Sequence, residues 1–524
     1  MKVAIYLAAF IFSALLITSC SDIQRNNTHK DVALSSIEKG KELAVLHCQS
    51  CHQLPDPSLV DTKTWERGIL PQMGPRLGIY FYKGKRYPSY QFDINLSAGY
   101  YPSKALVSED EWQFIMDYYI ATSPDTMSTY QHRKRPIQKN LQQFTAITPP
   151  SFKISDPSTC FVKIDTSDAL NPLVISDAFK EVIYRFNNKL EFSDSVKTKG
   201  PVVNVTMQNN KWVVCNIGDL NPNNRKLGNA QYMVTIDNKI KPDSNFIFDN
   251  LRRPVQIMAA DLNNDNKEDY LVCEFGFLEG ALSWMENKGT GKYERHVLRP
   301  LPGAIQAYVE DYNHDGLEDI WVLFAQAKEA VFLFTNKGSG QFEEAEVLSF
   351  LPINGSSYFE LADFNKDGRT DIVYTCGDNA DYSTVLKPFH GVYIYMNDGN
   401  NHFTEKYFFP INGCYKAMAR DFDNDGDLDL AAIAYFPDYQ HQPEEGFVYL
   451  ENKGDLDFYP YSLPAAETGR WLTMDAGDYD KDGWIDIVLG NFSVAPSFIK
   501  STVDWKKAPS FLVLKNTGKK SAQN

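Results

Sequence analysis

The stretch Asp311-Tyr-Asn-His-Asp-Gly-Leu-Glu-Asp319 decides the fold of this chain, because its acidic pattern occurs five times. Each copy has Asp at positions 1, 5 and 9 and Asn or Asp at position 3, and an apolar run follows directly. The copies begin at residues 261, 311, 363, 421 and 478, so they are spaced 50, 52, 58 and 57 residues apart. A period of about 50 residues with several short strands predicts the blades of a β-propeller.

Each repeat also contains a later hydrophobic strand that ends in Asn-x-Gly. These turns begin at Asn287, Asn336, Asn397, Asn452 and Asn516. Two further units, near Phe161 and Val202, carry β-type runs but lack the acidic pattern. Two plus five units predict an all-β propeller of seven blades over residues 151–518.

The acidic positions are candidate Ca²⁺ ligands, because Ca²⁺ takes several oxygen ligands in tolerant geometry. Four copies have Gly at position 6, where a sharp turn is needed, and the first copy has Asn266. Position 12 never holds Glu and strands follow, so the loop is not an EF-hand. Asp- and Asn-rich turns without metal are the alternative. The predicted ligands are Asp261, Asn263, Asp265, Asp269, Asp311, Asn313, Asp315, Asp319, Asp363, Asn365, Asp367, Asp371, Asp421, Asp423, Asp425, Asp429, Asp478, Asp480, Asp482 and Asp486.

The five repeats resemble the FG-GAP or VCBS repeats of integrin-type propellers over residues 250–518. The resemblance implies about five Ca²⁺ ions held between blade strands. The chain has a formal net charge of −15, and these ions would offset ten of its negative charges. A chain this acidic is not expected to bind nucleic acid, which requires basic patches.

The motif Cys48-Gln-Ser-Cys51-His52, upstream of the repeats, predicts the covalent attachment of one haem c. Each thiol would add to a vinyl group of the haem, and His52 would be an axial ligand of the iron. Redox or zinc chemistry is the alternative use of the cysteine pair. Zinc would need a second pair of ligands at suitable spacing, and the nearby sequence offers none.

Met73 is the predicted sixth ligand, because flanking Pro and Gly residues place its thioether on a loop that can be held at the iron. Met116, His47 and water are the alternatives. The region resembles class I cytochrome c domains, in which a Trp-containing helix (Trp65 here), a ligand Met and a closing aromatic helix follow the haem motif. The gap before the Met is short for that family. Residues 37–123 are therefore expected to form a small all-α cytochrome c domain.

The N-terminus has the pattern of a bacterial lipoprotein signal peptide. Lys2 precedes an apolar run, Val3 to Ile17, that is too short for a good transmembrane span. The end of this run, Ile-Thr-Ser-Cys20, resembles a lipobox, which implies a signal peptide over 1–19 and lipidation of Cys20. An ordinary signal peptide with an incidental Cys is the alternative. We expect a protein of the bacterial cell envelope that faces the periplasm or the cell surface and is held to the membrane by lipid.

The remaining segments are expected to connect these parts. Residues 20–36 are polar and unpatterned, which predicts a tether. Residues 124–150 are polar and basic and end in two Pro residues, which predicts a linker, and residues 519–524 are a tail. The repeat array also holds five cysteines, which we expect to be buried free thiols, with a Cys376–Cys414 disulfide as the alternative. These five are Cys160, Cys215, Cys273, Cys376 and Cys414.

One polar residue in each repeat, five positions before the first Asp, is predicted to lie in a ring near the propeller axis. The five are Gln256, Gln306, Tyr358, Lys416 and Thr473. Such a ring could bind a polar, carbohydrate-like ligand. A water-filled channel lined by solvated groups is the alternative.

Together these features predict an exported electron carrier whose propeller docks a redox partner, such as a periplasmic dehydrogenase or oxidase. An iron with two protein ligands has no open position for substrate, which favours electron transfer over catalysis. No nucleophile–base constellation stands out, so no catalytic residue is predicted. Two alternatives remain: a propeller enzyme, such as a sugar dehydrogenase or a lyase, wired to the haem, and an adhesion or carbohydrate-binding module with an accessory haem.

Overall fold

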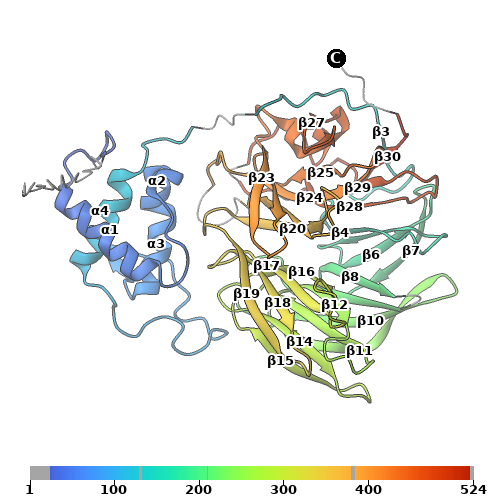
Figure 1. Ribbon diagram of the computed structural model, residues 1–524, viewed down its shortest axis with the longest axis horizontal. Helices are drawn as coiled ribbons and strands as arrows, with labels where there is room; N and C mark the ends of the chain where they lie inside the picture. The colour runs from blue at the N-terminus through green and yellow to red at the C-terminus, as the bar shows by residue number, and fades with distance from the viewer. Residues whose placement is uncertain (1–23, 129–132, 209–210, 379–383, 498, 520–524) are drawn as a thin grey trace, which may run out of the picture.

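The computed structural model describes residues 24–128, 133–208, 211–378, 384–497 and 499–519. A small helical unit lies beside a ring of β-sheets (Figure 1). The predicted signal peptide and Cys20 lie outside the described residues. Within the described part of the chain, no helix is long and apolar enough to cross a membrane.

The helical unit is built on two long helices, α1 (Leu34–Cys48) and α4 (Glu109–Thr122). Ser108 and Glu111 form a capping box at the start of α4. The helices cross at Gly40, where a Cβ atom would lie 1.9 Å from the carbonyl oxygen of Phe114. Glycine is therefore required for this close approach. The shorter elements between the two helices are η1 (Pro57–Leu59), α2 (Thr62–Thr64), η2 (Trp65–Ile69), α3 (Leu70–Met73), η3 (Gly74–Leu77), β1 (Phe81–Tyr82) and β2 (Lys85–Arg86).

The core of the helical unit is aromatic. Trp65, Trp112 and Tyr119 are all buried, and the ring centroids of Trp65 and Tyr119 are 4.3 Å apart. The apolar face of α4, which also includes Ile115 and Met116, points into this core. Residues before α1 pack here as well. The side-chain amide of Asn26 donates to the carbonyls of residues 120 and 123 at 2.6 and 2.9 Å. The expected tether is thus partly folded onto the unit.

The propeller has seven four-stranded antiparallel sheets, which confirms the predicted number of blades. The first strand of each blade contacts the first strand of the next, so these strands surround the axis. The first three blades are β4 (Thr159–Ile164), β5 (Leu173–Asp177), β6 (Val182–Phe186), β7 (Phe192–Lys197); β8 (Val202–Gln208), β9 (Lys211–Asn216), β10 (Gly228–Ile236), β11 (Lys239–Leu251); and β12 (Pro254–Ala260), β13 (Asp269–Glu274), β14 (Ala281–Asn287), β15 (Tyr293–Arg299).

The next three blades contain the acidic loops that begin at residues 311, 363 and 421. They are β16 (Ala304–Glu310), β17 (Asp319–Phe324), β18 (Ala330–Asn336), β19 (Phe342–Ser349); β20 (Ser356–Ala362), β21 (Asp371–Cys376), β22 (Gly391–Asn397), β23 (Phe403–Pro410); and β24 (Cys414–Arg420), β25 (Asp429–Ala434), β26 (Phe447–Asn452), β27 (Phe458–Tyr461). The short helix η4 (Pro443–Gly446) precedes β26, and the short helix η5 (Pro464–Thr468) follows β27. In every acidic repeat the second strand begins at the Asp of position 9, and the third strand ends at the Asn of Asn-x-Gly.

The seventh blade joins the two ends of the propeller. Its strands are β28 (Trp471–Gly477), β29 (Asp486–Asn491), β30 (Phe511–Asn516) and β3 (Phe144–Ile147), with β3 antiparallel to β30. The prediction that residues 124–150 form a linker was therefore wrong at its C-terminal end. Because β3 supplies the outer strand of the last sheet, it closes the ring between the first and last blades.

The basic part of the expected linker is also bound to the propeller. Arg133 forms an ion pair with the buried Glu445, and Arg135 forms one with Asp457 at 2.7 Å. The guanidinium of Arg135 also stacks on the Tyr459 ring, 3.8 Å from its centroid. The basic residues that favoured a solvated linker instead find acidic and aromatic partners in the sixth blade.

Candidate functional site

The Cys48–His52 motif begins at the last residue of α1 and forms a tight turn. The amide of Cys51 donates to the carbonyl of Cys48 at 3.3 Å. Both thiols are free; Cys48 is half-buried and Cys51 is exposed. Burial and the neighbouring Cys51 raise the pKa of Cys48 to about 11. Cys48 therefore stays protonated near neutral pH, which slows its oxidation, because the thiolate is the reactive form.

His52 is held by a hydrogen bond that distinguishes its two ring nitrogens. Nδ1 lies 2.7 Å from the carbonyl oxygen of Gln53, and since a carbonyl can only accept, Nδ1 carries the proton. This leaves Nε2 as the nitrogen with a lone pair. Burial, and to a smaller extent the nearby Arg76 charge, lower the pKa of His52. The imidazole is therefore neutral, which is the form that binds a metal.

Met73 is the last residue of α3 and packs at the edge of the aromatic core, as do Cys48 and Leu54. The structure thus places Met73 and the cysteine motif against one apolar cluster. Met116, considered as an alternative ligand, is buried on the core face of α4 and serves packing. His47 is half-buried, and its carbonyl accepts from the Ser50 hydroxyl at 2.7 Å.

The cysteine motif lies next to the propeller. The side-chain amide of Gln53 donates to the hydroxyl of Ser349 at 2.7 Å. Ile353 and Val385, from the fourth and fifth blades, pack against the apolar cluster of the helical unit. The residues that follow α1 are therefore in direct contact with the propeller.

Residues 88–103, here called the docking loop, make a second contact between the units. The Tyr90 ring meets the Phe277 ring edge-on with 5.1 Å between centroids. The side-chain amide of Asn224 donates to Asp93 at 2.8 Å. Sequence reasoning missed this interface, although the aromatic density of the segment was a visible signal.

Arg252 and Glu279 hold the middle of the docking loop. Nη1 of Arg252 donates to the carbonyl of Asn95 at 3.0 Å, and the amide of Ser97 donates to Glu279 at 3.1 Å. Arg252 and Glu279 also form an ion pair at 2.6 Å. All of these propeller residues lie on the face of the β13–β14 connection. The acidic loops lie on the opposite face, since they connect the first and second strands.

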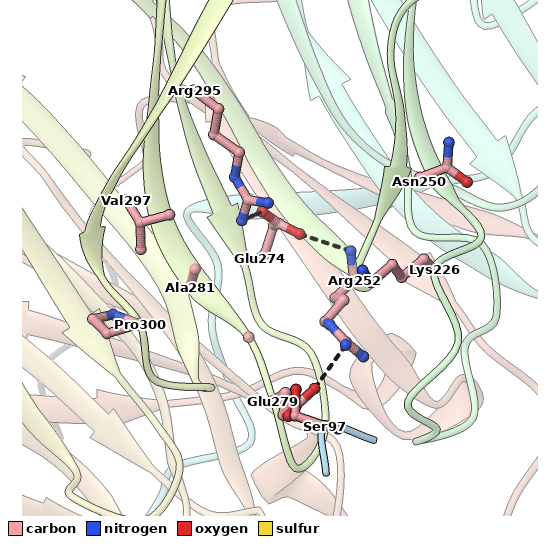
Figure 2. Close-up of a pocket in the computed structure, with 11 residues that line it drawn as sticks. Ser97, Lys226, Asn250, Arg252, Glu274, Glu279, Ala281, Arg295, Val297 and Pro300 are labelled. Carbon is pink, nitrogen blue, oxygen red and sulfur yellow. Dashed lines mark hydrogen bonds and ion pairs between the residues drawn. The ribbon is translucent and has the colours of Figure 1, made fainter. Parts of the chain in front are cut away.

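A cavity of about 320 Å³ opens beside the docking loop, as Figure 2 shows. Its walls come from the second and third blades and from Ser97 of the docking loop. The charged and polar groups are Lys226, Asn250, Arg252, Glu274, Glu279 and Arg295. None of the lining residues belongs to the segment from Cys48 to Met73, so this cavity is distinct from the cysteine motif.

The acidic loops share one backbone geometry. In the loop at 421, Oδ1 of Asp421 accepts from the amide of Asp425 at 3.1 Å and Oδ2 accepts from Gly426 at 3.0 Å. The first Asp of each of the other four loops accepts the same two amides at 2.8–3.2 Å. Position 6 has a positive φ in all five loops, and the residue there is Asn266 in the first loop and Gly in the other four. The Asp pattern thus shapes the turn itself.

The Asp at position 9 is buried and pairs two strands of its own blade. Oδ1 of Asp429 accepts from the amide of Asn452 at 2.8 Å, and the equivalent pairs in the other four blades are 2.7–2.9 Å long. Burial raises the pKa of Asp429 to about 8 and that of Asp486 to about 7. A nearby cation would offset this cost of burying a carboxylate.

Carboxylate oxygens converge in the last two acidic loops. Those of Asp421, Asp423 and Asp429 lie within 4.8 Å of one another, and so do those of Asp478, Asp480 and Asp486. In the last loop, the ammonium of Lys515 contacts Asp480 and lies 3.2 Å from Asp482.

The predicted polar ring lies on the first strands of the blades, and three of its members, Gln256, Tyr358 and Lys416, form hydrogen bonds to neighbouring blades. Gln256 accepts from the amide of Ala307 at 2.6 Å and donates to the carbonyl of the same residue at 3.1 Å. Lys416 donates to the carbonyl of Met474 at 2.9 Å, and burial lowers its pKa. Through these hydrogen bonds, the ring residues connect adjacent blades to one another. The equivalent positions on β16, β20 and β28 hold Gln306, Tyr358 and Thr473.

The five propeller cysteines are buried free thiols, as predicted. Burial raises the pKa of Cys160 and of Cys376 to about 12. The alternative of a Cys376–Cys414 disulfide is not what the structure contains.

The FG-GAP-like repeat pattern matches residues 261–322, 311–374 and 421–489, and each match begins at the first Asp of an acidic loop. Cartilage acidic protein 1 of Xenopus tropicalis is 28% identical over 179 residues, which cover 30% of this chain and 25% of that protein. The mouse protein of the same name is 27% identical over 172 residues, covering 30% and 25% of the two chains. The chain therefore spans about a quarter of the length of these relatives.

Two solved structures resemble the chain at low sequence identity. The N-terminal domain of Nup159 is 11% identical with a TM-score of 0.41, covering 74% of this chain and 99% of that one. Sqt1 of Saccharomyces cerevisiae is 9% identical with a TM-score of 0.42, covering 72% and 98%. The chain contains FG-GAP-like repeats and folds as a seven-bladed propeller.

Proposed function

We propose that the chain is an electron-transfer protein whose helical unit carries one covalently attached haem c. The observation that carries the proposal is the state of the Cys48–His52 motif. Two free thiols stand three residues apart, and the adjacent imidazole is neutral and keeps Nε2 for a metal. These donors fit the attachment and axial ligation of a haem c.

Each residue of the motif has a defined part in this proposal. Cys48 and Cys51 would hold the porphyrin through thioether bonds, and His52 would ligate the iron. The hydrogen bond to the Gln53 carbonyl keeps the imidazole in one tautomer and limits its rotation. Met73, against the same apolar cluster, would complete the iron coordination.

A haem c in this position would supply one-electron redox chemistry. With His52 and Met73 both bound, no position would be open to substrate or oxygen, so the unit would be a carrier of electrons and not a catalyst. The apolar cluster beside the motif, with Ile353 and Val385 from the propeller, would exclude water from one side of the site. Burial of this kind raises the reduction potential, because it disfavours the more highly charged oxidised iron.

The chain would then act at the bacterial cell envelope with a protein redox partner. Lipidation of Cys20, in the segment outside the described residues, would hold it to the membrane. The partner would be a periplasmic dehydrogenase or oxidase, or another electron carrier. An adhesion module or a propeller enzyme wired to the haem would use the same attachment.

We also infer that the acidic loops bind Ca²⁺. The inference is supported by the FG-GAP-like repeats and by the convergence of carboxylate oxygens in the last two loops. The buried Asp429 and its partners concentrate negative charge, and a divalent cation would compensate it.

Expression in a host that attaches haem to exported CxxCH proteins tests the haem proposal. The purified chain should gain the mass of one haem and show the pyridine haemochrome spectrum of a thioether-linked haem. Cys48→Ser together with Cys51→Ser should abolish both. A wild-type chain without covalent haem under these conditions overturns the proposal.

The sixth ligand is tested separately with a matched pair of methionine variants. Met73→Leu should remove the charge-transfer absorption band of a methionine–iron bond and lower the reduction potential, while covalent haem is retained. Met116→Leu, which alters a buried Met on α4, should keep the band. Loss of the band in Met116→Leu alone would assign the ligand to Met116 instead.

A further inference from the structure

The cavity of about 320 Å³ beside the docking loop lies where two blades and the helical unit meet. Asn250 comes from the end of β11, while Ala281, Arg295 and Val297 come from β14 and β15. Ser97 of the docking loop closes one side (Figure 2). A cleft between domains, lined by convergent polar groups, is a common location for small-ligand sites.

The charges in the cavity leave one cation unmatched. Glu274 pairs with Arg295 at 2.5 Å, and Glu279 pairs with Arg252 at 2.6 Å. Lys226 lines the same cavity, is exposed, and has no ion-pair partner among the residues that the structure describes. The cavity therefore carries a net charge of about +1, which favours a ligand with one negative charge.

The remaining lining suits a hydroxylated ligand. Asn250 offers an amide that both donates and accepts, and Ser97 offers a hydroxyl. Glu279, whose side chain is 21% exposed, offers carboxylate oxygens as acceptors for ligand hydroxyl groups. Ala281, Val297 and Pro300 form a small apolar surface, against which the C–H face of a sugar ring can pack. The volume is at the lower end of the range for ligand pockets, which suits a monosaccharide.

We propose that this cavity binds a hydroxylated monocarboxylate, that is, a sugar acid of monosaccharide size. Lys226 and the outer edge of the Arg295 guanidinium receive the carboxylate, and Asn250, Ser97 and Glu279 receive hydroxyl groups. The helical unit contributes Ser97 directly, and Arg252 and Glu279 hold the loop that carries it. The site is therefore complete only when the two units are docked. It does not depend on a haem being attached.

Isothermal titration calorimetry on the full chain tests the proposal. The probes are galacturonate, neutral galactose, acetate and inorganic phosphate, in matched buffers. Galacturonate should bind saturably and at least tenfold more tightly than each of the other three. Lys226→Gln should weaken galacturonate binding about tenfold. Arg225→Gln makes the same change of charge at the adjacent residue, whose guanidinium pairs with Asp219 outside the cavity, and should leave the affinity within twofold.

The outcomes separate the parts of the proposal. Equal binding of galactose removes the role of the carboxylate, and equal binding of acetate or phosphate removes the role of the hydroxyl groups. Equal losses in the Lys226 and Arg225 variants, or no binding of galacturonate, overturn the site. Thermal unfolding of both variants, expected within 2 °C of the wild type as befits exposed positions, excludes misfolding as the cause of a loss.

Discussion

The aspartate at position 9 of each acidic loop joins the second and third strands of its own blade. In the sixth blade its carboxylate accepts from the Asn452 amide at 2.8 Å and from the Tyr449 hydroxyl at 2.7 Å. It thereby ties the start of the second strand to the end of the third. The Asp and the Asn-x-Gly turn are one structural unit, although they stand over twenty residues apart in this blade. Ligand chemistry alone does not account for this Asp.

Gly40 is predicted to be essential for the crossing of α1 and α4. In Gly40→Ala the new methyl group would lie 1.9 Å from the Phe114 carbonyl oxygen, so the helices must move apart. We expect a destabilisation of about 1–3 kcal/mol, as for other overpacked sites. Chemical denaturation followed by far-UV circular dichroism measures it. Ser35→Ala on the exposed side of the same helix is the control, and equal stability of the two variants would contradict the predicted crossing.

His390 is predicted to make the propeller sensitive to acid. It is fully buried, and burial holds its pKa well below the usual range. The unfolded chain gains a proton below pH 6.5 while the folded chain does not, so stability should fall as the pH drops. The contribution is at most about 1.4 kcal/mol per pH unit.

The pH dependence of urea unfolding between pH 5 and 7 measures this effect. His390→Gln should flatten the slope, whereas His402→Gln, at a side chain that is 81% exposed, should leave it unchanged. An unaltered slope in the first variant would assign the acid sensitivity to other groups.

Among the elements, β3 has the largest consequence for its size. It has only four residues, yet it completes the last sheet from a position more than 350 residues before its partner strand, β30. Without β3, the outer edge of β30 would be unpaired. The segment that leads to it is bound along the sixth blade through Arg133 and Arg135.

Phe144→Ala is predicted to weaken this closure. Phe144 is 4% exposed, and its ring packs edge-on against Phe422 at 5.9 Å and Tyr449 at 5.5 Å. Loss of a buried Phe side chain costs about 3–5 kcal/mol. Thermal unfolding monitored by calorimetry should show a marked decrease in Tm, with Thr145→Ala, an exposed position on the same strand, as the control. Equal Tm values for the two variants would mean that β3 does not stabilise the ring.

The acidic loops are predicted to make the propeller depend on calcium. A strong chelator should lower the Tm, because a site filled at 100 times its Kd contributes about 2.7 kcal/mol. Asp425→Asn should reduce the calcium-dependent gain in Tm. Asp427→Asn in the same loop, at a side chain that pairs with Lys366 and lies outside the ligand set, should not. A Tm that is insensitive to the chelator would refute calcium binding.

At the scale of the whole molecule, the helical unit docks on one face of the propeller and the acidic loops lie on the other. The proposed calcium sites and the contact with the helical unit are therefore spatially separate. The docking face carries the Gln53–Ser349 contact, the docking loop and the cavity. Ligand binding in the cavity and the position of the helical unit would share Arg252 and Glu279.

Phe277→Ala is predicted to loosen the two units from each other. It removes the edge-on contact with Tyr90, which lies at the centre of the docking loop interface. Small-angle X-ray scattering should show a larger radius of gyration and greater flexibility, and limited proteolysis should cut faster within residues 88–103. Phe81→Ala removes an exposed aromatic of the helical unit and should change neither measurement. Identical scattering from both variants would argue against docking through this loop.

The repeat pattern was enough to predict the propeller, its seven blades, the strand boundaries of the acidic repeats and the buried free cysteines. All of these depend on short-range patterns, namely repeated spacing and hydrophobic runs, whose physical causes act within a blade. The tertiary structure alone decided the closure by β3, the binding of the basic segment to the sixth blade, the docking loop and the cavity. Those contacts join residues far apart in the chain, and they form because a closed ring and a shared interface bury groups that no local pattern pairs in advance.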